Sequence, residues 1–237
     1  MIYMKVYSHR GESTYACENT MSAFYLAEFV KSDGIECDIR KTRDDILVII
    51  HDKSIDRTSS KSGNVSDYTY EELLEFDFGN SKFHGEKIVR LDDFLKYFSQ
   101  KKMHIFLEIK EEGYESKIVN IVKKYNNEYI TLISFKYEIL EKIRAISNVL
   151  NLGWLTYDFS QRVLQKCKNI KLNQVLVMSI GLQKSEVKTL HDEGFIVTAW
   201  GVINKTDISR LYKIGVDRII YDSGYDAKKV IKELESE

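Results

Sequence analysis

Short apolar runs alternate with amphipathic segments along most of this chain, and the alternation limits the folds that are open to it. Each run has the length of a strand, and the segment after it has helical periodicity. Regular alternation of strands and helices is typical of α/β proteins, and eight such units in 237 residues predict a TIM (β/α)8 barrel. The expected strands are 5–8, 34–38, 105–109, 129–133, 150–154, 174–178, 195–200 and 218–221.

One further apolar run, 46–50, does not fit this alternation. It begins too soon after the second expected strand for a parallel crossover, so we expect it to fold back as an antiparallel hairpin arm. A turn between the two runs would place Ile49 opposite Asp38 and His51 opposite Glu36. An imidazole would then lie beside two carboxylates.

Residues 53–87 are mostly polar and rich in Ser, Asp and Gly. Segments of this kind lie outside the main layers of a domain and often cover a site. The rest of the chain contains neither a recognisable repeat nor a linker. We therefore expect a single TIM-barrel domain over residues 1–237, with 53–87 as a small insertion near the mouth of the active site.

The composition argues against several classes of protein. A net charge of −1 and the lack of a basic block make nucleic acid an unexpected partner, and no apolar run is long enough for stable insertion into a membrane. Cys17, Cys37 and Cys167 are odd in number and form no C-x-x-C pair, which argues against disulfides and zinc. A strand is expected within a few residues of the start, which leaves no room for a signal peptide, so we expect a cytoplasmic location. The sequence does not set an oligomeric state.

Ionisable side chains gather at the expected ends of the first three barrel strands. Alternate residues of a strand share a face, so Glu36 and Asp38 point the same way on the second strand. Catalytic groups of TIM barrels lie at the carboxyl ends of the strands, which locates the expected site. Its expected members at these ends are His9, Arg10, Glu36, Asp38, Glu108 and Lys110.

Three of these residues are carboxylates on neighbouring strands, and they would repel one another without a cation. Ligand sets made only of oxygen suit a hard divalent ion, so we expect one Mg²⁺ or Ca²⁺. The expected metal ligands are Glu36, Asp38 and Glu108.

The remaining charged residues indicate the chemistry of the substrate. Arg10 and Lys110 add fixed positive charge beside the expected cation, which favours an anionic group such as a phosphate. His9 and His51 approach from different loops, as a general acid and a general base should. Neither the roles of the two histidines nor the route follows from the sequence, because the nucleophile is either a hydroxyl group of the substrate next to the ester or a water.

Together these motifs resemble the glycerophosphodiester phosphodiesterase family over nearly the whole chain. Each motif alone is weakly specific, but their combination and order are highly specific. The motifs are His9-Arg10-Gly11, Glu18-Asn19-Thr20, Ala23-Phe24, Gly34-Ile35-Glu36-Cys37-Asp38, Thr42-Arg43-Asp44, His51-Asp52, Arg57-Thr58, Leu107-Glu108-Ile109-Lys110, Ser134-Phe135, Trp200, Asn204 and Gly215-Val216-Asp217.

The resemblance implies a TIM barrel with a small insertion after the second strand, and hydrolysis of a small-molecule glycerophosphodiester to sn-glycerol 3-phosphate and an alcohol. It also implies metal ligation by the three carboxylates, acid and base roles for His9 and His51, and phosphate contacts from Arg10 and Lys110. The chain departs from the family pattern at the mouth, where Gly201 follows Trp200 and the family often has Thr. Substrate choice is what this departure affects.

Several assignments keep an alternative. Trp200 is either a substrate-contacting residue of the mouth or part of a barrel layer, and Asn19 is expected as the N-cap of a helix over 20–31. A lysophospholipase D activity is the alternative within enzymes, and it would need an apolar patch at the mouth that the polar insertion does not supply. A non-catalytic barrel that binds phosphodiesters is the alternative outside enzymes, although such a module has no reason to keep an acid and base pair.

Overall fold

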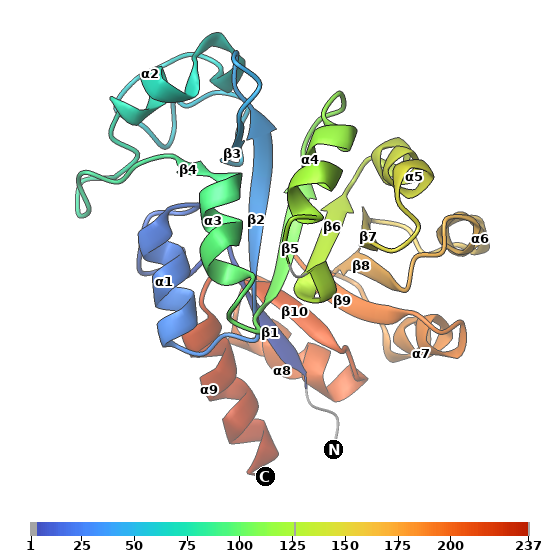
Figure 1. The fold of residues 1–237 in the computed structure, drawn as a ribbon. Helices are drawn as coiled ribbons and strands as arrows, with labels where there is room; N and C mark the ends of the chain where they lie inside the picture. The colour runs from blue at the N-terminus through green and yellow to red at the C-terminus, as the bar shows by residue number, and fades with distance from the viewer. Residues whose placement is uncertain (1–3, 126, 237) are drawn as a thin grey trace.

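Eight parallel strands form a closed barrel in the computed structural model, which describes residues 4–125 and 127–236 (Figure 1). The barrel closes because β1 pairs in parallel with both β2 and β10, which confirms the predicted TIM barrel. Each of the eight expected runs is a strand, with ends shifted by at most a few residues. The barrel strands are β1 (Lys5–His9), β2 (Gly34–Lys41), β5 (His104–Ile109), β6 (Ile130–Ser134), β7 (Asn151–Thr156), β8 (Gln174–Met178), β9 (Ile196–Trp200) and β10 (Arg218–Tyr221).

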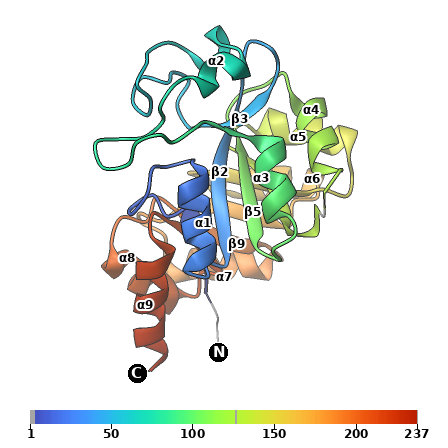
Figure 2. The same ribbon diagram turned by 60° about the vertical axis from the view of Figure 1, so that its left-hand side comes forward.

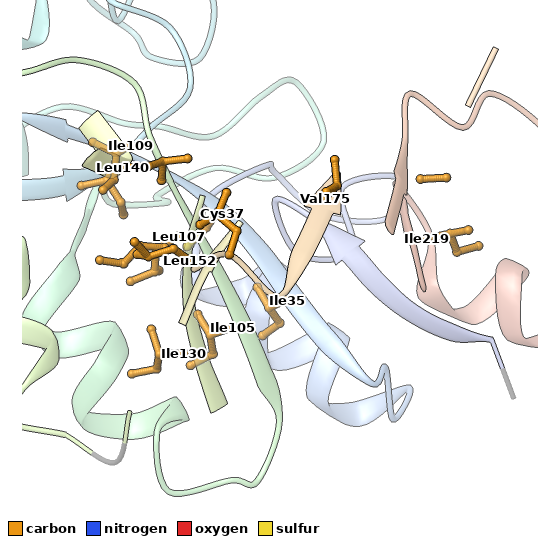
Figure 3. Close-up of a cluster of buried hydrophobic side chains, with 14 of the residues drawn as sticks. Ile35, Cys37, Ile105, Leu107, Ile109, Ile130, Leu140, Leu152, Val175 and Ile219 are labelled. Atoms are coloured by element: carbon orange, nitrogen blue, oxygen red, sulfur yellow. The ribbon is translucent and has the colours of Figure 1, made fainter. Parts of the chain in front are cut away.

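Helices surround the barrel, and a large apolar core fills the space between them and the strands. Alternate strand residues point outward, so Ile35 and Cys37 of β2 join Leu107 of β5 in this core (Figure 3). Leu140 meets them from a covering helix. The helices are α1 (Met21–Phe29), α3 (Leu91–Phe98), α4 (Glu115–Val122), α5 (Tyr137–Ile146), α6 (Gln161–Asn169), α7 (Lys184–Asp192), α8 (Lys205–Ile214) and α9 (Gly224–Glu235).

The side chains that point inward fill the barrel with a second, smaller core. Tyr7 and Phe106 stack there with ring centroids 4.4 Å apart. Gly34 leaves the room for this pair, because a Cβ atom at that position would lie 2.3 Å from the Tyr7 ring. The inner core consists of Tyr7, Phe106, Ile133, Leu155, Leu176 and Ile220. It closes the barrel below the polar residues at the carboxyl ends of the strands.

An antiparallel arm made of β3 (Leu47–Ile49) and β4 (Val89–Arg90) extends the sheet beyond β2. The expected register is wrong by one residue, because Ile49 pairs with Ile39 and not with Asp38. The turn is the reason: Asp45 has a φ of 64°, and the Thr42 side chain accepts a hydrogen bond from the Ile46 amide. His51 therefore does not pair with Glu36.

Residues 53–87 lie beyond the carboxyl end of β2, as Figures 1 and 2 show. They contain the short helices η1 (Val65–Asp67) and α2 (Tyr70–Leu74). A separate small core anchors them to the arm, since buried Ile55, Leu73 and Phe78 pack with Val48 of β3. The segment is thus fixed beside the barrel mouth.

Two further findings concern the helices. Thr20, not Asn19, is the N-cap of α1, and its side chain accepts a hydrogen bond from the Ala23 amide. The expectation for Asn19 is wrong because its amide group binds Asp38 instead. Within the described residues, no helix combines the length and apolar character needed to cross a membrane. A short helix, η2 (Asn127–Tyr129), precedes β6.

Candidate active site

A cavity of about 400 Å³ lies at the carboxyl ends of the barrel strands and has one polar and one apolar wall. The inner core forms its floor, because Ile133, Leu155 and Ile220 belong to both. The polar wall consists of His9, Arg10, Glu36, Glu108 and Asp222. The expected ends of the first three strands therefore do meet around one cavity.

Three carboxylates form a compact cluster at this wall. Asp38 of β2 is paired directly with Glu108 of β5, and Glu36 lies two residues before Asp38 on the same strand face. One oxygen from each carboxylate lies within 4.8 Å of the other two. All three are buried: Glu36 is 2% exposed, Asp38 0% and Glu108 8%. Buried carboxylates at this spacing need positive charge nearby.

Two cations of the chain supply part of that charge. Lys110 Nζ lies 2.9 Å from Asp38 Oδ1 and 2.7 Å from Glu108 Oε1, and Arg10 Nε lies 3.4 Å from Asp38 Oδ2. Asn19 Nδ2 donates a hydrogen bond of 2.8 Å to the same Asp38 oxygen. Burial alone would raise the pKa of Asp38, but Lys110 and Arg10 lower it to about 2. Asp38 is therefore ionised.

Glu36 has much less compensation. Its nearest cationic partner is His9, whose Nε2 lies 3.8 Å from Glu36 Oε2. Burial and the charge of Asp38 raise the pKa of Glu36 to about 8. Burial and Asp38 also raise the pKa of Glu108. The cluster is thus short of positive charge, and its donors are all hard oxygen atoms, so the residues fit a divalent cation.

His9 is oriented by an aspartate from the last strand. Its Nδ1 lies 2.6 Å from Asp222 Oδ1, just after β10, and this leaves Nε2 directed at the cavity side of Glu36. Burial would lower the pKa of His9, but the hydrogen bond to Asp222 and the charge of Glu36 raise it. Sequence reasoning did not assign Asp222 a role, although it stands at a barrel strand end.

His51 faces the cluster from the loop after β3. Its Nδ1 lies 2.6 Å from Asp52 Oδ1. The pKa of His51 is lowered, chiefly because the imidazole is partly buried. The charge of Lys110 also lowers this pKa, whereas the charge of Asp38 and the hydrogen bond to Asp52 raise it. His51 therefore interacts electrostatically with both Asp38 and Lys110, although it does not itself line the cavity.

A chain of ion pairs joins His51 to Arg10. Arg57, from the inserted segment, donates from Nε to Asp52 over 2.6 Å and from both terminal nitrogens to Glu18. Glu18 in turn accepts a hydrogen bond of 2.9 Å from Arg10. The motif Arg57-Thr58 was the only sequence signal for this link.

Trp200 lines the apolar wall of the cavity and also packs against the inner core. Its indole nitrogen donates to the Leu176 carbonyl over 3.2 Å. Phe135 and Tyr157 contact its ring edge to face. Gly201, which follows it, has a φ of 67°, a conformation that a β-branched residue such as Thr rarely adopts.

The other three histidines lie elsewhere. His104 contacts Tyr7 and Tyr129 near the amino ends of the strands, and His191 binds Asp217. His84 is exposed in the inserted segment. None of the three lines the cavity.

Comparison with known proteins agrees with this arrangement. Residues 9–224 match the model of the glycerophosphoryl diester phosphodiesterase family. A glycerophosphodiester phosphodiesterase of Caldanaerobacter subterraneus subsp. tengcongensis is 31% identical over 226 residues, which cover 92% of this chain and 93% of that protein. One from Bacillus altitudinis is 29% identical over 242 residues and matches 97% of this chain and 99% of the relative.

Solved structures share the fold. A phosphodiesterase of Oleispira antarctica, solved in complex with the product sn-glycerol-3-phosphate, superimposes with a TM-score of 0.90 at 24% identity and covers 96% of both chains. The match of the family model extends from His9 to Gly224 and so includes almost every barrel strand. The chain therefore belongs to the glycerophosphoryl diester phosphodiesterase family and is an enzyme of that class.

Proposed function

We propose that this chain hydrolyses glycerophosphodiesters to sn-glycerol 3-phosphate and an alcohol in a metal-dependent reaction, with His9 and His51 as the acid and base pair. The observation that carries the proposal is the carboxylate cluster at the polar wall, together with two histidines whose Nδ1 atoms are each bonded to an aspartate. The names of the relatives support the substrate class.

Glu36, Asp38 and Glu108 would hold one divalent cation, Mg²⁺ or Ca²⁺. Such a cation supplies positive charge for phosphoryl oxygens as negative charge grows on them. The chain's own cations act in the same direction, since Arg10 lines the cavity and Lys110 contacts two of the three carboxylates, Asp38 and Glu108. We propose that both stabilise the phosphate, and that Trp200 contacts the organic part of the substrate.

The two histidines move the protons. One takes the proton of the nucleophile, and the other gives a proton to the departing alkoxide. Asp222 and Asp52 each bind the Nδ1 atom of their histidine, which leaves both Nε2 atoms for proton transfer. Each aspartate thus fixes the ring orientation of one histidine.

The same proposal includes the organisation of the chain: one barrel domain over residues 1–237, with 53–87 as an insertion beside the site. The cytoplasmic location stays a prediction.

Release of sn-glycerol 3-phosphate from glycerophosphocholine and glycerophosphoethanolamine tests the proposal, measured with Mg²⁺, with Ca²⁺ and with EDTA. We expect release that requires a metal and is lost in His51→Ala. No release by folded, metal-supplemented protein would instead favour the non-catalytic barrel. Release in EDTA that equals release with Mg²⁺ or Ca²⁺ would contradict the proposed metal dependence.

A further inference from the structure

A second cavity, of about 410 Å³, lies at the amino end of the barrel, opposite the catalytic cavity. It is bounded by the first residues of β1 and β5 and by the segments after α1 and α3. We call it the amino-end cavity, and Lys5, Lys102 and His104 are among the residues that line it. No described residue lines both cavities, so they are separate sites at opposite ends of the same strands.

Both carboxylates of the amino-end cavity already have cationic partners. Lys101 Nζ lies 3.0 Å from Glu28 Oε1. Lys228 Nζ lies 3.3 Å from Asp33 Oδ1, and the other oxygen of Asp33 accepts a hydrogen bond from the Val6 amide. The negative charge of the cavity is therefore largely balanced before its remaining lysines are considered.

Three lysines of the cavity add positive charge that the chain does not balance. Within the described part of the chain, Lys5, Lys31 and Lys102 form no ion pair. Lys5 also stands beside Arg218, its register partner on β10, and Arg218 donates a hydrogen bond to the neutral Gln174 side chain. Cations at neighbouring positions repel one another. An anion bound here would relieve this repulsion.

His104 adds a neutral hydrogen-bonding group to the cavity. Its ring contacts Tyr7 and Tyr129 edge to face, with centroids 6.0 and 5.4 Å apart, and these contacts orient it. Neither ring nitrogen has a hydrogen-bond partner among the described residues. Burial lowers the pKa of His104 to about 4, and the charges of Arg218 and Lys5 lower it further. Both cations therefore act on this ring, which keeps an N–H group to donate.

Two buried hydroxyl groups at the same end of the barrel also lack a hydrogen-bond partner among the described residues, those of Tyr7 and Thr198. Both residues are fully buried. Thr198 is the register partner of Arg218, whose guanidinium carbon lies 5.8 Å from the centre of the Tyr7 ring. Nearly all buried hydroxyl groups in proteins have a partner. The amino end of the barrel thus combines excess positive charge with spare hydrogen-bonding groups.

We propose that the amino-end cavity binds a phosphate group, as inorganic phosphate or as a small phosphate monoester, beside Lys5, Lys102 and His104. A phosphate dianion balances more than one lysine, which a carboxylate or a chloride ion does not. Its oxygens accept hydrogen bonds from ammonium groups and from the imidazole N–H. The volume of the cavity leaves room for a small organic group on the phosphate. The site is independent of the proposed function, because it shares no lining residue with the catalytic cavity.

Histidine NMR spectroscopy tests this proposal, because the imidazole signals report on both ends of the barrel in one spectrum. Inorganic phosphate is added to the Mg²⁺-supplemented protein, and His104→Gln assigns the signal of His104. We expect this signal to shift in a saturable way, with a midpoint that differs from those of His9 and His51. Sodium chloride at equal ionic strength should not shift it.

Variants then assign the shift to the amino-end cavity. Lys5→Gln and Lys102→Gln should each raise the phosphate concentration at the midpoint at least fivefold, because each removes one cation. Lys102 is exposed, so its replacement should not disturb folding, and turnover of glycerophosphocholine should be unchanged in that variant. Lys184→Gln is the matched control, because Lys184 is also exposed but begins α7, at the catalytic end of the barrel. It should leave the midpoint unchanged.

A second titration, with sn-glycerol 3-phosphate, separates the two kinds of ligand. A lower midpoint than that of inorganic phosphate would support a phosphate monoester, and an equal or higher one would support recognition of the phosphate group alone.

Three results would overturn the proposal. The first is a His104 signal that stays in place while those of His9 or His51 move, since phosphate would then bind only in the catalytic cavity. The second is a shift that sodium chloride reproduces. The third is a midpoint that neither Lys5→Gln nor Lys102→Gln changes.

Discussion

Arg57 joins two parts of the site that are far apart in the sequence, because its guanidinium group contacts both Asp52 and Glu18. Asp52 binds His51, and Glu18 binds Arg10. Arg57 itself contacts neither the cavity nor the carboxylate cluster. We infer that it is a positioning residue, which holds His51 and Arg10 at a fixed separation.

Replacement of Arg57 by Ala should lower kcat about 10- to 100-fold, because small displacements of catalytic groups cost that much. Added guanidinium ion should restore part of the activity of Arg57→Ala. Arg57→Lys should recover only part of kcat, because the lysine ammonium group lacks the planar fork of donors of a guanidinium group. Steady-state kinetics of the variant measures this.

Arg43→Ala is the matched control for that variant. Arg43 is similarly exposed and also forms a two-bonded pair with a glutamate, Glu72, but away from the site. It should change kcat less than about twofold, since exposed pairs contribute little. Equal losses in the two variants would show that Arg57 acts only through stability.

The start of helix α1 lies beside the carboxylate cluster, because Asn19, two residues before the helix, binds Asp38. The residues that stabilise this end of the helix therefore also hold part of the site in place. Thr20 caps the helix, and its hydroxyl group both accepts from Ala23 and donates to the Cys17 carbonyl. Asn19, directly before it, adopts a φ of 57° and binds Asp38.

Thr20→Ala should lower the free energy of unfolding by about 1 kcal/mol, the usual effect of losing an N-cap. Thr20→Ser keeps the hydroxyl group and should recover most of it. Urea denaturation of the three proteins gives the values. A Thr20→Ser protein no more stable than Thr20→Ala would mean that the methyl packing, not the cap, stabilises the helix.

The elements were predictable from the sequence where periodicity alone decides them. Each barrel strand and helix was found because short apolar runs and helical spacing of apolar residues leave a local pattern, as in β5, where five consecutive residues are buried. The register of the arm was not predictable, since it depends on the positive φ of Asp45. Asn19 was expected to be an N-cap and not a partner of Asp38, because its hydrogen bond to Asp38 is a tertiary contact that leaves no local pattern.

The same division holds for the site. Strand ends identified the carboxylates and His9, because the barrel topology alone brings those positions together. The bonds of Asp222 to His9 and of Arg57 to Glu18 join residues 213 and 39 positions apart, and no local pattern encodes them.

For the molecule as a whole, the two ends of the barrel have different roles. The carboxyl ends of the strands hold the buried charges of the site, and His104 lies near the other end, where it contacts Tyr7 and Tyr129. Burial lowers the pKa of His104 to about 4, and the charges of Arg218 and Lys5 add to this effect, while Asp33 opposes it. This histidine is therefore neutral in the folded protein at neutral pH.

The free energy of unfolding should fall as the pH drops from about 6.5 towards 4, because the unfolded chain then binds a proton at His104 and the folded protein does not. The contribution of this one residue is at most about 1.4 kcal/mol per pH unit. Above about pH 6.5 it should be absent. His104→Gln should show a shallower fall in this range, measured by urea denaturation at several pH values.

His84→Gln serves as the comparison, because it removes an imidazole whose side chain is 76% exposed in the inserted segment. If His104→Gln follows the same curve as His84→Gln, the pH dependence of folding originates elsewhere.

We propose that two histidines catalyse phosphodiester hydrolysis beside a carboxylate cluster that holds the metal. The most direct test measures turnover of glycerophosphocholine and calorimetric binding of Mg²⁺ or Ca²⁺ on the same preparations of His9→Gln and His51→Gln. We predict a loss of turnover of at least 100-fold in each variant, with metal binding retained. Near-normal turnover in either variant, with metal bound, would contradict the account.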